Sequence, residues 1–521
     1  MNAISELQAS PRPRRARRAL WWSLSGDVLF TGVTVVVVLL RLYPLLSRHA
    51  PTGNDWAEML LVGHAYLGQA LPAGGATYPP LVPLLVVAAT TLFPTLPAIA
   101  VLGALASASP AAGLYIALRP MNRRILTALG ACLLLLASSS AEQAVWGGVG
   151  DLVGTTCLPM LLVLFMTNLV RPTRGRLFAF GAVVFLLTAA SYLSAAEAVP
   201  VLLVGLVVTI VLREPGHRRE VVRRLPALAA AAAPTLVLAP VYVRLLTTVR
   251  ISGVVSHSQA MSVLAKFNYV FREDPKFWAV CIAVAAFTPL LAIRQRHRPE
   301  ALYYQAGAAF VMATAAIAIA VPDIRFFYLV PAATAFGIAL WLASLDLRPR
   351  DVTTWVIPGL LIMVLAVNYG VEGAGAFRLY PGLVSFYGDT SMSPQLLQAV
   401  DWLHAHAGPR QLVAVSSIQG SPIGWWVEGL AERPALVEAN PQFLYLKGQR
   451  RADTEVHAIL SQFPSTNSLI MARQAGVSYI LMARASGQYH PGLTEEFIVS
   501  HAADVAFANQ GALIIRVPGP G

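Results

Sequence analysis

The sequence predicts a polytopic α-helical membrane protein with an extracytoplasmic α/β domain at its C-terminus. Of its 521 residues, 56% are hydrophobic and only 12% are charged, whereas soluble globular proteins contain about 25% charged residues. Long apolar runs continue as far as residue 370, and beyond it the apolar residues form short, strand-length runs. The composition and the long runs predict membrane helices, and the short runs predict a water-exposed domain.

Residues 1–25 are expected to form a basic N-terminus in the cytoplasm. The cluster Arg12–Arg18 precedes an apolar run that is too long for a signal-peptide core and has no clear cleavage site. Because Lys and Arg accumulate on the cytoplasmic side of membrane helices, we expect this run to stay in the protein as a membrane anchor.

Residues 26–370 contain the apolar segments that a membrane domain requires. About 20 apolar residues cross the hydrocarbon core as a helix, whose backbone polar groups are all bonded internally. Basic clusters mark alternate loops as cytoplasmic, which places the N-terminus inside and the C-terminal domain outside. The predicted spans are 27–46, 97–118, 124–141, 152–170, 176–194, 197–212, 225–247, 277–293, 301–321, 325–345 and 353–370.

The apolar segment 79–94 is too short for a full crossing. Counting it as a crossing would also move Arg119 and Arg123 to the outer side, against the charge rule. We therefore predict a juxtamembrane or re-entrant helix here and about 11 spans in total, while a count of 13 would leave both chain ends in the same compartments.

Residues 371–521 are predicted to form the extracytoplasmic α/β domain. Ser393 followed by Pro394 is typical of a helix start, and 411–415 and 477–482 have the length and composition of buried strands. The segments 504–508 and 512–517 are predicted to form a hairpin. Strands that alternate with helices over about 150 residues favour a layered α/β domain.

The net charge of +12 reflects topology, because the Lys and Arg residues lie in short clusters between apolar runs. We therefore expect no nucleic-acid partner. Cys132, Cys157 and Cys281 all lie within apolar runs and form no CxxC motif, so neither a disulfide framework nor a zinc site is predicted.

The first outer loop, 48–78, carries the candidate catalytic residues Asp55 and Glu58. Charge at a membrane boundary is costly without a task, and a carboxylate there can act as a general base toward an acceptor hydroxyl. An alternative is that Asp55 caps a helix starting at Trp56, with Glu58 at its third position. Tyr78, at the end of this loop, is a candidate contact of acceptor or sugar.

Glu142 and Asp151 form a second acidic group on either side of a glycine-rich turn. Small residues let the backbone approach a ligand closely, so both are candidate contacts of acceptor or sugar, while Asp151 also suits a helix cap. Asp55 and Asp151 are candidate ligands of a divalent metal, Mg²⁺ or Mn²⁺. Such sites usually gather several carboxylates, and no convincing third one is found.

Arg325 lies among aromatic residues at a predicted outer boundary, where a guanidinium can hold the phosphate of a lipid carrier. Snorkelling to the interface, or pairing with Asp323, is the alternative. Arg244, Lys266 and Arg272 also lie on or near the outer side and are further candidates for binding phosphate.

The C-terminal domain contains the adjacent residues Trp425 and Trp426, followed by Glu428. Such a group could contact an acceptor or a sugar face. A Trp pair more often fills the core of a small α/β domain, and that alternative is favoured here.

Together these features resemble the GT-C class of membrane glycosyltransferases. The resemblance rests on Asn54-Asp55-Trp56-Ala57-Glu58 in the first outer loop, on Tyr78-Pro79-Pro80-Leu81 after it, and on Arg325-Phe326-Phe327-Tyr328-Leu329-Val330-Pro331 near the last helices. It implies a bacterial inner-membrane enzyme that moves a sugar from a polyprenyl-phosphate carrier to a glycan, lipid or protein acceptor at the outer face. It also implies inversion with Asp55 as general base, and no required cofactor.

The tail is similar to the catalytic subunit of oligosaccharyltransferases, whose motif is Trp-Trp-Asp-Tyr-Gly. This chain has Trp425-Trp426-Val427-Glu428-Gly429, followed by Arg433 and Glu438-Ala439-Asn440. Transfer of a whole glycan to protein is therefore an alternative function. A non-catalytic transporter or scaffold for lipid-linked sugars is another, although the inverted halves common in transporters are not found.

Overall fold

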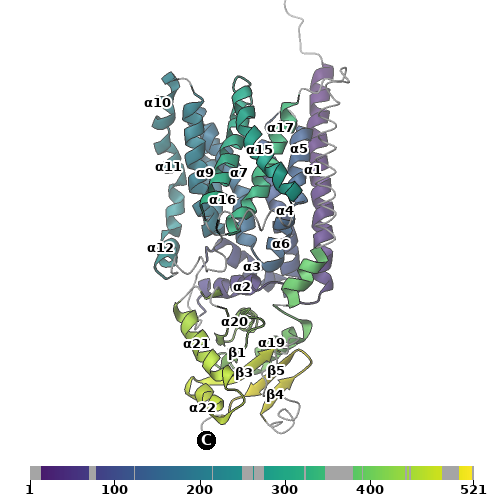
Figure 1. Ribbon diagram of the computed structural model, residues 1–521, viewed down its shortest axis with the longest axis vertical. Coiled ribbons are helices and arrows are strands. Elements are labelled where there is room, and N and C mark those ends of the chain that lie inside the picture. Colours follow the sequence, from purple (N-terminus) through teal and green to yellow (C-terminus); the bar gives the residue numbers. More distant parts are fainter. Residues whose placement is uncertain are drawn as a thin grey trace, which may run out of the picture.

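A computed structural model places a bundle of long helices at one end of the molecule and a smaller α/β domain at the other (Figure 1). It describes residues 13–69, 78–121, 124–213, 215–248, 262, 275–321, 324–345, 380–389, 391–440, 443–444, 447–483 and 504–518. Two short helices and the ends of the bundle meet the α/β domain at the junction.

The bundle consists of apolar helices that run side by side along the long axis of the molecule. Seven helices in the described part of the chain are long and apolar enough to cross a membrane, or eight if the bent pair α5–α6 counts as one span. All described helices of the bundle, including those too short to cross a membrane alone, are α1 (Pro13–Ser47), α4 (Thr95–Leu118), α5 (Arg124–Leu135), α6 (Ser138–Trp146), α7 (Val149–Val170), α8 (Arg174–Ala190), α9 (Tyr192–Val211), α10 (Pro215–Arg223), α11 (Leu225–Ala232), η1 (Ala233–Leu238), α12 (Ala239–Thr248), α15 (Pro275–Arg294), α16 (Ala301–Ala320), η2 (Ile324–Leu329) and α17 (Val330–Ser344).

Ten of the eleven predicted spans coincide with helices of the bundle, and the predicted segment 353–370 lies outside the described residues. Fewer than ten meet the length required of a span, because α8 has 17 residues and α5 ends where the chain bends by 50° into α6. The membrane-protein class is thus confirmed, while the number of crossings stays a prediction.

Arg41 stabilises the bundle at the break between α5 and α6. Its side chain is buried, and its guanidinium donates to the carbonyl oxygens of Ser107, at 3.0 Å, and of Leu135. The last carbonyls of a helix have no partner within the helix, so Arg41 supplies one where α5 ends. Within the bundle this guanidinium therefore bonds protein backbone, not a ligand phosphate.

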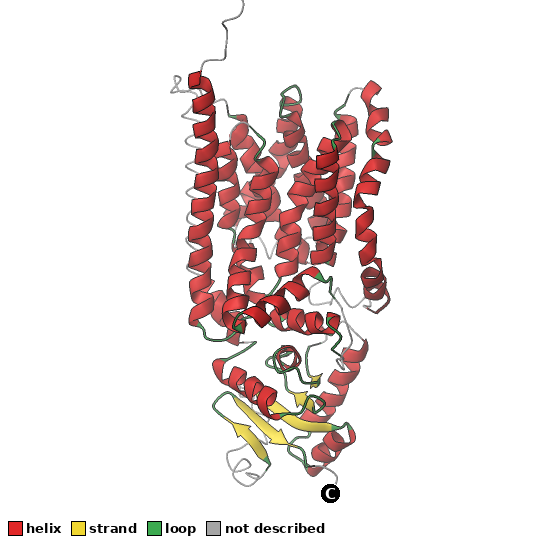
Figure 2. Ribbon diagram, turned by 180° about the vertical axis from the view of Figure 1, so that it is seen from behind, coloured by secondary structure: helices red, strands yellow, loops and turns green. Residues whose placement is uncertain are grey.

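Helices α2 (Asp55–Tyr66) and α3 (Leu81–Leu92) lie across the end of the bundle, between it and the α/β domain (Figure 2). Each has 12 residues, which is too few to cross the hydrocarbon core. The sequence-based expectation of a short helix in 79–94 agrees with α3.

The α/β domain contains a five-stranded sheet in the order β2-β1-β3-β5-β4. Strands β2 (Ala435–Val437), β1 (Leu412–Val415) and β3 (Val477–Ala483) are parallel, and β5 (Ala512–Arg516) pairs antiparallel with β3 and with β4 (Val505–Ala508). The predicted strands and the predicted hairpin are therefore confirmed. The domain's helices are α19 (Pro394–His406), α20 (Gly424–Gly429), α21 (Lys447–Ser461) and α22 (Thr466–Gln474).

Each face of the sheet belongs to a different hydrophobic core. Ala414 of β1 packs with residues of α21 and α22, whereas Val413 and Val415 pack with α19 and α20. This second core continues into the bundle end, where it includes Trp56 and Leu60 of α2. The domain and the short helix that carries the acidic pair therefore share one apolar core.

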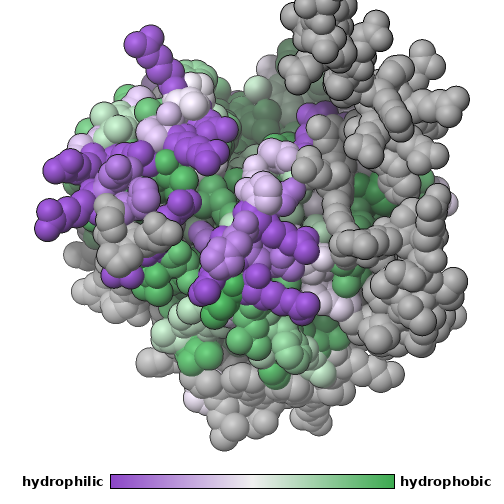
Figure 3. Space-filling view, turned by 90° about the horizontal axis from the view of Figure 1, so that it is seen from above, coloured by the Kyte–Doolittle hydropathy of each residue, from purple (hydrophilic) through white to green (hydrophobic). Residues whose placement is uncertain are grey.

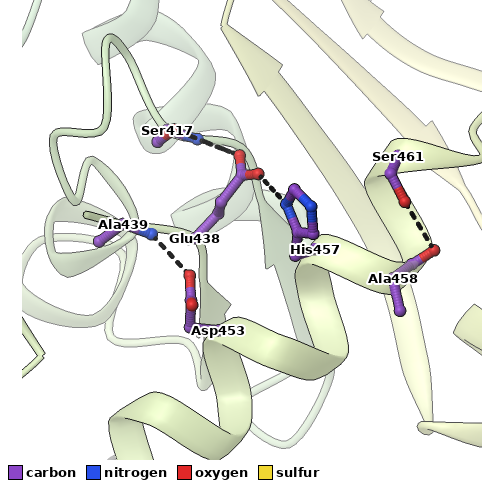
Figure 4. A network of polar contacts seen from close by, with 7 residues as sticks. All are labelled: Ser417, Glu438, Ala439, Asp453, His457, Ala458 and Ser461. Atoms are coloured by element: carbon purple, nitrogen blue, oxygen red, sulfur yellow. Dashed lines mark hydrogen bonds and ion pairs between the residues drawn. The ribbon is translucent and has the colours of Figure 1, made fainter. Parts of the chain in front are cut away.

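Polar contacts fasten α21 to the ends of two parallel strands (Figure 4). Glu438 Oε2 accepts from the backbone N–H of Ser417 at 2.9 Å, and its Oε1 lies 3.1 Å from His457 Nδ1. Asp453 Oδ1 accepts from the backbone N–H of Ala439 at 3.0 Å. These bonds join the segments that follow β1 and β2 to successive turns of one helix.

Hydrophilic side chains form patches on the end of the bundle away from the α/β domain, with hydrophobic side chains between them (Figure 3). Exposed arginines gather on the loops and helix ends of this side. Arg224 links the start of α11 to the end of α7 by donating to the carbonyl of Leu169 at 2.7 Å. The exposed arginines of this side include Arg119, Arg171, Arg174, Arg176, Arg218, Arg219, Arg223, Arg294, Arg296 and Arg298.

Close packing of α4 on α7 depends on Gly113. A Cβ atom at this position would lie 2.1 Å from the carbonyl oxygen of Thr156, and backbone cannot move aside as a flexible side chain can. We expect Gly113→Ala to lower the free energy of unfolding by about 1–3 kcal/mol, the usual cost of overpacking. Unfolding by SDS in mixed micelles measures the change.

Gly32→Ala is the matched control, because a Cβ at Gly32 meets nothing within 4 Å. Alanine is the better helix former, so this variant should be as stable as the wild-type protein or slightly more so. Equal losses in both variants would contradict the packing of α4 on α7 described above.

Candidate active site

The N-terminus of α2 is held against the turn between α6 and α7. Thr52 Oγ1 donates to the carbonyl oxygen of Val145 at 2.7 Å. Gly147 has a φ of +103°, and a Cβ there would lie 2.8 Å from the Cβ of Asp55. The glycine-rich turn singled out in the sequence thus lets backbone approach Asp55 closely, a position where any side chain would be strained.

Asp55 and Glu58 lie one turn apart in α2, so their side chains share a face of the helix. Glu58 is buried, whereas Asp55 keeps part of its surface exposed. Burial raises the pKa of Asp55, the nearby Asp151 raises it further, and Arg325 partly offsets both. Burial followed by repulsion from Asp55 raises the pKa of Glu58. Ionisation of one carboxyl group therefore disfavours ionisation of the other.

The proposed capping role of Asp55 is wrong. The helix starts at Asp55 itself, the N-cap position belongs to Asn54, and among the described residues the Asn54 side chain bonds none of the first amides. Asp55 can still interact favourably with the positive end of the helix dipole. Its carboxylate is therefore available for chemistry without giving up a cap.

Asp151 reaches the same place from the first turn of α7. Its Oδ1 accepts from the hydroxyl of Ser191 at 2.6 Å, and the residue at the N-cap position of α7 is Gly148. Because Asp151 raises the pKa of Asp55, these two carboxylates, predicted from separate loops, lie close enough to repel each other. Ser191 in turn caps α9 by accepting from the N–H of Ser194.

Arg325, in η2, joins this group through Tyr192. Its side chain hydrogen-bonds to the Tyr192 hydroxyl, and the rings of Tyr192 and Tyr78 meet edge to face with centroids 5.4 Å apart. The same guanidinium lowers the pKa of Asp55. Residues far apart in the chain, 55 and 325, therefore face one site.

Tyr78 forms part of the wall of this site. Its carbonyl oxygen accepts from the Tyr66 hydroxyl at 2.7 Å, and its own hydroxyl lies near Gly150. Burial, followed by repulsion from Asp151, raises the pKa of Tyr78 well above its ordinary value. The phenol therefore stays neutral and can donate a hydrogen bond to a ligand oxygen.

Other predicted residues lie elsewhere. Glu142 accepts from the Tyr387 hydroxyl at 2.7 Å, which ties α6 to the helix formed by 380–389. Arg244, on α12, lies near Tyr66, whose pKa it lowers against the larger effect of burial. Lys266 and Arg272 lie outside the described residues.

Trp425 and Trp426 are fully buried in α20, so the packing alternative describes them. The Trp425 ring meets that of Phe443 edge to face, and Trp426 Nε1 donates to Asn54 Oδ1 at 3.1 Å. Contact of this pair with an acceptor stays a prediction from the sequence.

Metal binding also stays a prediction. Across the described ranges, no group of three or more His, Cys, Asp or Glu residues has an arrangement that could hold a metal ion. The candidates Asp55 and Asp151 lie near each other, but Ser191 already occupies one oxygen of Asp151.

Ser191 and Tyr192 are the site residues that sequence reasoning missed. A Ser before a long apolar run is a signal for a helix start, and Ser191 does occupy the N-cap of α9. Nothing in the order of residues, however, indicates that this helix start faces Asp151 and Arg325. That juxtaposition depends on how the helices pack.

No protein-family model matches the sequence, and no curated protein matches it. Solved structures with a similar fold exist. The crystal structure of ArnT from Cupriavidus metallidurans in the apo state gives a TM-score of 0.56 at 15% identity, covering 95% of this chain and 99% of that chain. A crystal structure of ArnT from the same organism bound to undecaprenyl phosphate gives 0.53, with the same identity and coverage. The fold expected from the GT-C resemblance is therefore confirmed over nearly the whole chain.

Glu428 provides a test of the buried electrostatics. It is fully buried, its Oε1 accepts from the N–H of Ala435 at 3.4 Å, and within the described residues its Oε2 has no partner. Burial raises the pKa of Glu428 to about 8 from its ordinary 4.5. Between these two pH values the folded protein keeps a proton on Glu428 that the unfolded chain has released. The free energy of unfolding therefore falls as the pH rises from about 4.5 through 8.

We expect Glu428→Gln to remove that loss. The thermal midpoint of the wild-type protein should fall relative to the variant between pH 5 and pH 8, over a window set by the raised pKa of about 8. The exposed Glu455 on α21 offers a matched control, Glu455→Gln. The same pH-dependent difference in both variants would show that burial of Glu428 is not its cause.

Proposed function

We propose that this protein is an integral-membrane glycosyltransferase that moves a sugar from a polyprenyl-phosphate carrier to an acceptor hydroxyl. The observation that carries the proposal is the gathering of Asp55, Glu58 and Asp151 with Arg325 at one end of an apolar bundle. The ArnT structure bound to undecaprenyl phosphate supports the choice of carrier, because the chain has that fold.

Arg325 is the proposed partner of the donor phosphate. A guanidinium offers paired N–H groups that match phosphate oxygens, and the contact is strong where water is scarce. Arg244 lies near Tyr66, on the same side of the bundle end, and supplies a second positive charge. A lipid carrier reaches such a site laterally from the bilayer, since its chain stays among the apolar helices.

Asp55 is the proposed general base. The acceptor hydroxyl gives its proton to the Asp55 carboxylate while its oxygen forms a bond to the anomeric carbon. On the opposite side the bond from that carbon to the phosphate oxygen breaks, and its electron pair leaves with the phosphate. Attack opposite the leaving group inverts the anomeric centre, and Arg325 stabilises the charge that develops on the phosphate.

The raised pKa of Asp55 suits this role, because a base works best when its pKa approaches the working pH. Glu58 assists by sharing the proton that Asp55 collects, as the two groups are coupled by burial and mutual repulsion. The neutral hydroxyls of Tyr78 and Tyr192 can orient sugar oxygens beside them.

The charges support an orientation in the membrane. With the arginine-rich end of the bundle assigned to the cytoplasm, the proposed location of the carboxylates and the α/β domain is the outer face of a bacterial inner membrane. There the α/β domain covers the site and helps to select the acceptor, whether glycan, lipid or protein.

Loss of the donor contact is the first test. We expect Arg325→Gln to weaken binding of undecaprenyl phosphate by about 10–100-fold, in line with about 1.5–3 kcal/mol for a hydrogen bond to a charged group. The thermal shift of detergent-solubilised protein, titrated with undecaprenyl phosphate, measures it. Arg48→Gln is the control, because Arg48 pairs with Asp389 at the same end of the bundle; equal weakening there would remove the assignment.

The second test concerns the base. Asp55→Asn should lower turnover by about 10²–10⁴-fold, the usual contribution of general base catalysis, while leaving undecaprenyl phosphate binding within a few-fold. Mass spectrometry of polyprenyl-phosphate sugars from the source cells, converted to free carrier by purified protein, gives the rate.

Asp389→Asn, at an exposed carboxylate, is its control. Full activity of Asp55→Asn would exclude the base assignment. Because micelles have no second compartment, release of free carrier also separates an enzyme from a transporter: a transporter would return the donor unchanged.

A further inference from the structure

Asn54, at the N-cap of α2, bonds to the α/β domain instead of capping its own helix. Asn is among the best N-cap residues, yet its side chain makes no cap bond within the described residues. Its Oδ1 instead accepts from Trp426 Nε1 at 3.1 Å, across 372 positions of sequence. Both side chains are buried, so water does not compete for this bond.

The helix that carries Trp426 lies directly on α2. A Cβ at Gly429 would come within 3.0 Å of the carbonyl oxygen of Ala57 and 3.1 Å of the Cβ of Leu60. α20 therefore touches α2 backbone just after the acidic residue Asp55. The contact and the Asn54 bond fix α2 from the side of the α/β domain.

The opposite side of the same turn is fixed by the bundle. A Cβ at Gly53 would lie 2.2 Å from the Cα of Trp146, and Gly147 touches Asp55. The segment 53–55 is thus clamped between the α6–α7 turn and α20. Movement of either partner must move the carboxylate at the start of α2.

We propose that Asn54 and Trp426 are positioning residues through which the α/β domain sets the location and the hydration of the Asp55 and Glu58 carboxyl groups. This inference rests on the proposed function for its catalytic meaning only. Loss of the bond frees the first turn of α2, water enters beside the acidic pair, and the geometry needed for base catalysis is lost.

The groups around Asp55 and Glu58 determine how loss of the Asn54–Trp426 bond would change the pKa of the two carboxyl groups. Asp151 from α7 and Arg325 from η2 face Asp55, and Tyr78 and Tyr192 lie beside them. Burial is the largest cause of the raised pKa of both carboxyl groups. Added water weakens that cause, so their pKa should fall toward the ordinary range.

The experiment measures protonation at the pair without any substrate. Dicyclohexylcarbodiimide, an apolar reagent that reacts with protonated carboxyl groups, is applied to the full-length protein in detergent at a series of pH values. Mass spectrometry then follows the adduct on the peptide that contains Asp55 and Glu58. We expect the labelling midpoint of Trp426→Phe to lie about one pH unit below that of the wild-type protein, a shift typical of altered surroundings.

Trp425→Phe is the matched control, since it makes the same change at the next residue, whose ring packs on Phe443. Its labelling midpoint should stay at the wild-type value. If Trp426→Phe does not accumulate, Asn54→Ala tests the same bond from α2, and the double variant should shift no further than either single one. Unchanged midpoints, or equal shifts in Trp425→Phe, would overturn the proposal.

Turnover and binding of undecaprenyl phosphate, measured on the same variants, distinguish failure of this inference from failure of the proposed function. A shifted midpoint with lowered turnover and intact binding of undecaprenyl phosphate supports both. A shifted midpoint in a protein that neither binds this carrier nor consumes a polyprenyl-phosphate sugar leaves the positioning role standing and removes the enzymatic one.

Discussion

Electrostatic repulsion between one buried and two half-buried carboxylates, offset by one guanidinium, is the interaction on which the site depends. Asp55 and Glu58 share a helix face, and Asp151 approaches them from α7. Several negative charges in a medium of low dielectric are costly, so protons and Arg325 must balance them. The arrangement is stable only while η2, α7 and the start of α2 stay together, and this is what the bundle and the α/β domain provide.

Much of this arrangement could be predicted from the sequence, because membrane helices and short strands follow from patterns of apolar residues alone. The short helix after Tyr78 and the strands of the sheet follow in this way. Position in the chain also suggested that Arg325 faces the outer side. The composition of a loop, however, cannot show which helix starts meet, so the contact of Asp151 with Ser191 was not predictable.

Local rules failed where tertiary contacts competed with them. The pattern Asn-Asp-Trp suggested a cap by Asp55, but Asn54 holds the N-cap position and its Oδ1 accepts a hydrogen bond from Trp426. Arg41 lies near the end of α1, where a long side chain could extend to water, yet it satisfies backbone carbonyls where α5 ends. In both cases a side chain bonds a group far away in the sequence. The reason is that a buried donor or acceptor without a hydrogen bond costs more than one exposed to water.

The buried Arg41 also bears on how the chain is assembled in the membrane. α1 precedes α4 and α5 in the chain and is therefore made before them, yet the carbonyls that Arg41 bonds belong to those two later helices. During synthesis its charge must therefore stay near the lipid headgroups, close to the end of α1, where a long side chain can reach water. The Leu135 carbonyl becomes available to Arg41 only after α5 has been inserted, so burial of this charge is coupled to the arrival of a later helix.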